Sequence, residues 1–208
     1  MQSTFAPTFQ VYRDKIGKMG EYVGVVSPVI TTNVAQLPIF VESIVVLTIA
    51  YMEDFLASLV GSAVREREVE LRQHLSKGLT EQERTTVMTC DIPVLVQLAK
   101  RRVDFRKKGA RLEALFQVMF GSSPWPDVNT LTTITDLVLV RQLIVHQGGG
   151  DLGSYASQVS QPGLFTVRDY QGLKVYWLAH TQVLILYREA LVALNAQLQY
   201  LERVLPQR

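Results

Sequence analysis

The chain has 208 residues, of which 48% are hydrophobic and 19% are charged, and its formal net charge at pH 7 is +2. This composition excludes a disordered protein, which combines low hydrophobicity with high net charge. The ordinary content of 13 Gly and 8 Pro excludes collagen-like and low-complexity chains. A net charge of +2 gives no general reason to expect nucleic-acid binding, so the local placement of charges matters more than their sum.

The mean hydropathy of +0.14 raises the question of a membrane-spanning segment. The longest apolar runs without a charge are 43–52 and 175–187, and both are shorter than the roughly 18 to 20 residues that a spanning helix needs. The first residues lack the basic region and apolar stretch of a signal peptide. The single cysteine, Cys90, forms neither an internal disulfide nor a zinc cluster of cysteines. We therefore expect a cytoplasmic protein with no membrane partner.

The first 36 residues contain three glycines and two prolines before Pro38, and we predict a short helix with an irregular N-terminal arm over 1–36. From there on, apolar residues recur at helical spacing along most of the chain. The helices predicted from this spacing are, in chain order, 39–60, 65–77, 80–89, 91–109, 110–120, 130–146 and 177–205.

Local signals set several of these boundaries. Thr80 with Glu83 has the pattern of a capping box, and Asp91 followed by Pro93 is typical of a helix start. Gly78 and Gly121 are expected to end helices. Two short β-prone runs, 164–167 and 173–176, predict a hairpin before the last helix. The sequence therefore predicts one all-α domain over 1–208 with a small β-hairpin.

The predicted helix 130–146 is apolar on every side, which is typical of a central buried helix. Arg141 and His146 interrupt this apolar surface at positions where core residues would otherwise stand. Burying an unpaired guanidinium costs several kcal/mol, so Arg141 must be paired, reach the surface or line a cleft. A structural ion pair for Arg141 and a capping role for His146 at the helix end are the ordinary alternatives.

The segment Arg141-Gln-Leu-Ile-Val-His146 resembles the Arg-x4–6-His motif of the HEPN superfamily (higher eukaryotes and prokaryotes nucleotide-binding). Its surroundings are similar too: an early long apolar helix with an acidic turn, then the motif helix, a glycine-rich turn, a short flap and a long last helix. The similarity is greatest to the ribonuclease-type branch, called RiboL-PSP-HEPN. It covers about 38–62 and 128–205, and 63–127 is interpreted as an insertion of extra helices.

The resemblance implies a homodimer in which two motif helices face each other across a two-fold axis. It also implies RNA cleavage without a metal or cofactor, with Arg141 and His146 as the catalytic residues. His146 would accept the proton of the ribose 2′-hydroxyl or protonate the leaving oxygen, and Arg141 would hold the phosphate. Residues five apart on a helix point about 140° from each other, so Arg141 of one protomer is expected to act with His146 of the other.

Five further positions bear on this resemblance. Gln142 follows the arginine where many members have asparagine. One of the acidic residues Glu42, Glu53 and Asp54 is a candidate to pair with Arg141 or to orient His146, the alternative being a solvated position. Gly148 stands where some toxin members carry a tyrosine that a nucleotidyltransferase antitoxin modifies. That modification is therefore not expected, although an antitoxin or another regulatory protein remains open as a partner.

A concentrated group of basic residues, opposed only by Asp104, lies in one short segment. Its members are Lys100, Arg101, Arg102, Arg106, Lys107, Lys108 and Arg111. This basic segment predicts binding to RNA phosphates, with a solvated helix face as the alternative.

Three functions remain open at this point. The first is a dimeric HEPN-type endoribonuclease, acting as a toxin or an antiviral defence effector. The second is a non-catalytic HEPN-like module that binds a partner protein or a nucleotide. The third is an all-α scaffold in which the motif has arisen by chance. The sequence has no phosphate loop, dinucleotide fingerprint or nucleophile elbow, and neither His74 nor His180 has metal-ligand spacing to another ligand.

Overall fold

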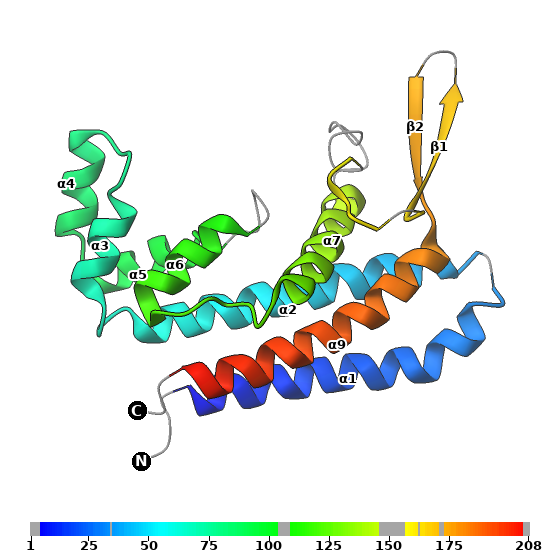
Figure 1. Cartoon of the computed structure of the whole chain (residues 1–208), viewed down its shortest axis with the longest axis horizontal. Helices are drawn as coiled ribbons and strands as arrows, with labels where there is room; N and C mark the ends of the chain where they lie inside the picture. Colours follow the sequence, from blue (N-terminus) through cyan, green and yellow to red (C-terminus); the bar gives the residue numbers. More distant parts are fainter. Residues whose placement is uncertain are drawn as a thin grey trace. The chain divides into compact units, whose positions relative to one another are not determined.

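The computed structural model describes residues 5–33, 35–103, 109–145, 157–161, 163–170 and 173–205. The described chain is built from helices and one antiparallel hairpin (Figure 1), so the predicted all-α class with a small hairpin before the last helix is confirmed. Its elements are α1 (Ala6–Ile30), α2 (Leu37–Ala63), α3 (Glu68–Leu75), α4 (Glu81–Thr89), α5 (Ile92–Lys100), α6 (Ala110–Phe120), α7 (Val128–Val145), β1 (Phe165–Tyr170), β2 (Leu173–Leu178) and α9 (His180–Val204).

The irregular N-terminal arm expected over 1–36 is wrong, because α1 is one continuous helix of 25 residues. Each interior glycine costs such a helix about 1 kcal/mol relative to alanine, and Pro28 lies within its last turns. A buried apolar stripe at helical spacing offsets these costs. The stripe consists of Phe9, Tyr12, Ile16, Met19 and Val23.

Two capping interactions predicted for the middle of the chain are present in the structure. The capping box of Thr80 and Glu83 is present, and Asp91 Oδ1 accepts a hydrogen bond from the Val94 amide at 3.0 Å. The predicted helix 91–109, however, ends at Lys100. Its buried positions, Leu95 and Ala99, end with that turn, and the basic residues that follow offer no further apolar face to bury.

The described chain divides into two compact units, which are considered separately. The first consists of Met1–Tyr12, Met52–Pro126 and Leu198–Arg208. Within it, α3 contacts α4, α5 and α6. Arg72 of α3 is buried, and its guanidinium donates to Glu68 Oε1 at 2.8 Å, to the Val87 carbonyl at 2.6 Å and to the Cys90 carbonyl at 2.7 Å. This arginine therefore ties α3 to the end of α4.

The second unit consists of Arg13–Tyr51 and Asp127–Gln197. It holds α7 and the hairpin, in which Phe165 pairs with Leu178 and Tyr170 with Leu173. A buried hydrogen bond of 2.7 Å joins the hydroxyl groups of Thr48 on α2 and Tyr187 on α9. This bond satisfies two polar groups that would otherwise be costly in the core.

Two helices, Leu37–Ala63 and Val128–Val145, are long and apolar enough to cross a membrane when length and composition alone are considered. In each, half of the most apolar window is buried inside the protein. Charged residues interrupt both helices: Glu42, Glu53 and Asp54 in the first, and Asp136 and Arg141 in the second. The expected absence of a membrane partner stays a prediction.

Candidate functional site

The predicted catalytic residue Arg141 lies near the C-terminal end of α7. This helix begins after Asp127, whose Oδ1 accepts a hydrogen bond from the Thr130 amide at 2.7 Å, an N-cap interaction. Every residue from 134 to 140 is buried, Arg141 and Gln142 are half-buried, and Val145 is 51% exposed. Arg141 therefore stands where α7 passes from the core to the solvent.

The Nε atom of Arg141 is buried and has no hydrogen-bond partner among the described residues. Leaving a buried donor without a partner costs about 1 to 3 kcal/mol. A structural ion pair would remove this cost, but no ion pair of Arg141 occurs within the part of the chain that the structure describes. Within the described residues, the Nε–H donor of Arg141 is therefore unsatisfied.

His146, the second predicted catalytic residue, follows directly after the last residue of α7 but lies outside the described residues, as do the glycines 148–150. Its predicted role stays a prediction. Gln142 is half-buried next to Arg141 in the last turns of α7, and its predicted supporting role is likewise untested.

The acidic residues of α2 are distributed over both units. Glu53 is half-buried and Asp54 exposed, and both belong to the first unit, whereas Arg141 belongs to the second. Their supporting role stays a prediction. Glu42, which shares the second unit with Arg141, instead places Oε1 3.1 Å from Nε2 of His180. This contact joins Glu42 of α2 to the start of α9.

One charged residue of α7 did not figure in the sequence argument. Asp136 is 1% exposed, and its carboxylate accepts hydrogen bonds from the amides of Ser160 at 2.9 Å and Gln161 at 3.2 Å. The Gln161 side chain donates in turn to Glu189 of α9 at 2.7 Å. Asp136 thus anchors the segment before the hairpin, and its position as an acidic residue within an apolar run is the sequence signal that could have identified it.

The basic segment spreads over several environments. Lys100 is half-buried, and its Cε lies 2.8 Å from where a Cβ on Gly61 of α2 would stand. Arg101 is exposed, Arg102 is half-buried and Arg111 is exposed in the first turn of α6. Arg106, Lys107 and Lys108 lie outside the described residues.

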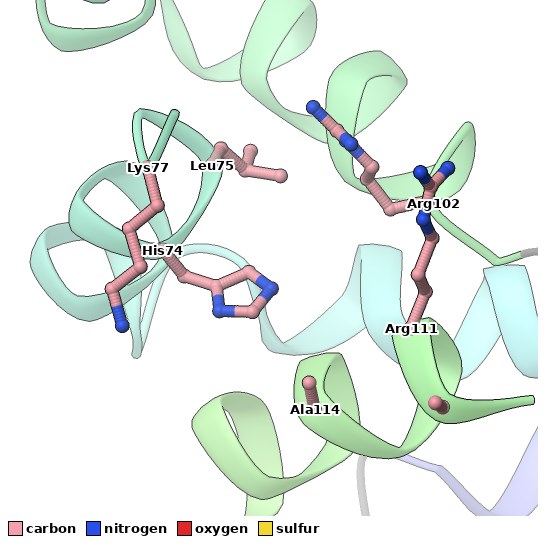
Figure 2. A pocket seen from close by; sticks show the side chains of 7 residues that line it. His74, Leu75, Lys77, Arg102, Arg111 and Ala114 are labelled. Atoms are coloured by element: carbon pink, nitrogen blue, oxygen red, sulfur yellow. The ribbon is translucent and has the colours of Figure 1, made fainter. Parts of the chain in front are cut away.

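Arg102 and Arg111 line a cavity of about 240 Å³ in the first unit (Figure 2). His74 and Lys77, from the end of α3 and the turn after it, line the same cavity, and none of its lining residues within the described ranges is acidic. Leu75, Ala110 and Ala114 complete its wall. His74 and Lys77 could not be linked to the basic segment from the sequence, because they lie more than 20 residues before it.

The charge of this cavity acts on His74. Burial lowers the pKa of His74 below its usual range, and the positive charges of Lys77 and Arg102 lower this pKa further. His74 is consequently neutral at pH 7 in the absence of a bound anion. Its imidazole can then donate one hydrogen bond and accept another.

Among the described residues, no group of His, Cys, Asp or Glu side chains is arranged to hold a metal ion. Comparison of the chain with protein families, with curated proteins and with solved structures finds no match.

Proposed function

We propose that the chain is a metal-independent endoribonuclease of HEPN type whose composite site forms at a homodimer interface. The observation that carries this proposal is the buried Nε of Arg141 without a partner, at the solvent end of α7 and five residues before His146. A buried donor left without a partner is costly for folding. A phosphate bound at this position during function would satisfy the donor and offset that cost.

The chemistry needs only groups that this sequence supplies. The 2′-oxygen of the ribose attacks the adjacent phosphorus, the bond from phosphorus to the 5′-oxygen breaks, and a 2′,3′-cyclic phosphate and a 5′-hydroxyl result. His146 accepts the proton of the 2′-hydroxyl or donates one to the leaving 5′-oxygen. Arg141 stabilises the negative charge that grows on the phosphate oxygens. A toxin or an antiviral defence effector is the biological setting that this activity suits, with an antitoxin or other regulatory protein as its partner.

The test is cleavage of mixed cellular RNA in EDTA by the wild-type protein, by Arg141→Ala and by His146→Ala. We expect the wild type to cut and to leave cyclic-phosphate ends. Each variant should be at least about 100-fold slower, since general acid–base catalysis contributes on the order of 100-fold or more. Arg84→Ala is the matched control, because Arg84 is an exposed arginine of α4 whose side chain pairs with Glu81 at 3.5 Å.

Circular dichroism and thermal unfolding of all four proteins establish that they are folded. Folded wild-type protein that leaves every RNA intact contradicts the proposal. Variants of Arg141 and His146 that cut as fast as the wild type contradict it equally.

A further inference from the structure

A second feature of the molecule points to a ligand independently of α7. The cavity between α3 and α6 is lined by four basic side chains from three parts of the chain: His74 from α3, Lys77 and Arg102 from the turns after α3 and α5, and Arg111 from α6. The positive charges of Lys77 and Arg102 repel each other across this space unless an anion lies between them. None of the described lining residues is acidic, since the other members are Leu75, Ala110 and Ala114.

Three of the four basic side chains of this cavity have no partner among the described residues. His74, Lys77 and Arg102 have no side-chain hydrogen bond or ion pair within the described residues. Arg72, on the same helix α3, shows the contrast, since Glu68 and two backbone carbonyls satisfy its guanidinium. The donors of Arg102 and His74 are therefore available to a ligand.

The arrangement of these groups suits a phosphate. Figure 2 shows the His74 ring directed into the space between α3 and α6, with Arg102 and Arg111 on the opposite side. The first turn of α6 starts at Gly109, which has a positive φ of 73° and makes no side-chain cap hydrogen bond. Amides in the first turn of a helix favour an anion, and they here add to the guanidinium groups of Arg102 and Arg111.

The size and the apolar wall of the cavity narrow the ligand class. A volume of about 240 Å³ is below the roughly 300 to 1,000 Å³ of pockets that enclose drug-sized ligands. It accommodates a phosphate with part of its organic group. The small side chains of Ala110 and Ala114 leave room beside the basic groups, and Leu75 supplies an apolar contact.

We propose that the cavity lined by His74, Lys77, Arg102 and Arg111 is a binding site for a phosphate group carried by a nucleotide. This site lies within the first unit and belongs to no step of the cleavage reaction at Arg141. The phosphate comes either from a free mononucleotide or from the backbone of an RNA strand, and both share the chemistry that the cavity recognises.

The experiment measures the binding of three probes to the full chain by calorimetry at one fixed, low salt concentration, because phosphate binding depends strongly on salt. The probes are uridine, uridine monophosphate and a short oligouridylate with 2′-O-methyl groups, which cannot be cleaved through the 2′-oxygen. None of them requires nuclease activity, so a failure of the proposed cleavage would leave this test intact.

We expect uridine monophosphate or the oligomer to bind and uridine not to bind. Arg102→Gln should weaken binding about tenfold or more, since a charge-assisted hydrogen bond contributes about 1.5 to 3 kcal/mol. Arg84→Gln, an exposed arginine of the same unit outside the cavity, should leave affinity within about twofold. Lys77→Gln is the second variant, because Lys77 is exposed and its loss does not threaten the fold.

Each outcome decides the proposal. Comparable affinity for uridine monophosphate and the oligomer identifies a free nucleotide as the ligand. Much higher affinity for the oligomer identifies an RNA strand as the ligand. Both results support the site. Equal binding of uridine and uridine monophosphate overturns phosphate recognition. Affinity that is unchanged in both Arg102→Gln and Lys77→Gln overturns the cavity as its location.

Discussion

At the scale of single residues, a charge within an apolar pattern identifies a residue of interest, but the sequence does not show which group that residue contacts. The sequence singled out Arg141, and the structure places it at the end of the buried part of α7 with an unbonded Nε. Asp136 on the same helix was overlooked, and its partners, the amides of Ser160 and Gln161, lie more than 20 residues further along the chain. Such partners cannot be read from spacing along one helix.

The buried hydroxyl pair of Thr48 and Tyr187 leads to a prediction about alkaline pH. Burial raises the pKa of Tyr187 to about 12, although its hydrogen bond with Thr48 opposes part of this rise. An unfolded tyrosine ionises near pH 10. As the pH rises from about 10 to 12, the unfolded chain therefore loses this proton while the folded chain keeps it, and the free energy of unfolding falls by about 2 kcal/mol.

Urea unfolding at pH 8, 10 and 11.5 of wild type and Tyr187→Phe tests this expectation. The variant loses the hydrogen bond at pH 8 and should be about 1 kcal/mol less stable there. The difference between the two proteins should shrink or reverse at pH 11.5, because the variant has no phenol at this position to ionise. A difference that stays constant over this range would show that Tyr187 does not carry the effect.

At the scale of elements, local sequence signals predict helix boundaries well where a capping residue is present. They predict helices poorly where tertiary packing determines whether the helix forms. The capping box at Thr80, the start at Asp91 and the end at Gly121 depend on contacts within a few residues, and the structure confirms them. The helix expected to run to Gly78 ends earlier, at Leu75, with Ser76 as its C-cap. The helix α1 was missed because its glycines and Pro28 are unfavourable locally, whereas burial of its apolar stripe is a tertiary effect.

The glycines of α1 lead to a prediction about helix stability. A Cβ added at Gly17 would meet no atom within 4 Å, and Gly17 is exposed in the interior of α1. Gly17→Ala should therefore raise the free energy of unfolding by about 1 kcal/mol. Gly78→Ala is the matched comparison, because Gly78 also has open space but has a φ of +76°, and alanine there should cost about 1 kcal/mol.

Urea unfolding monitored by circular dichroism measures both changes. Gly17→Ala that destabilises the protein as much as Gly78→Ala would mean that α1 is not helical at this position in solution.

At the scale of the whole molecule, the proposed site requires two copies of the chain, and this leads to a prediction by complementation. If Arg141 of one protomer acts with His146 of its partner, a dimer of one Arg141→Ala and one His146→Ala chain keeps one complete site. Refolding an equal mixture of the two variants should then restore about one quarter of wild-type activity, because half of the dimers are mixed and each has one of two sites.

Arg141→Ala refolded with the double variant Arg141→Ala/His146→Ala serves as the control and should stay inactive. If the equal mixture of Arg141→Ala and His146→Ala is also inactive, although analytical ultracentrifugation shows that it forms dimers, both residues of a site belong to one protomer. A chain that sediments as a monomer while cutting RNA would rule out the composite site altogether.

The helical class, the hairpin, several helix ends and the unusual position of Arg141 can be predicted from the amino-acid sequence, because each of these depends on periodicity or on hydrogen bonds between near neighbours. Three features emerge only from the folded chain: α1 is one long helix, Asp136 anchors a distant segment, and His74 lies with Arg102 and Arg111 around one cavity. These features depend on burial and on contacts between residues far apart in the chain, and the pattern of a single segment does not encode them.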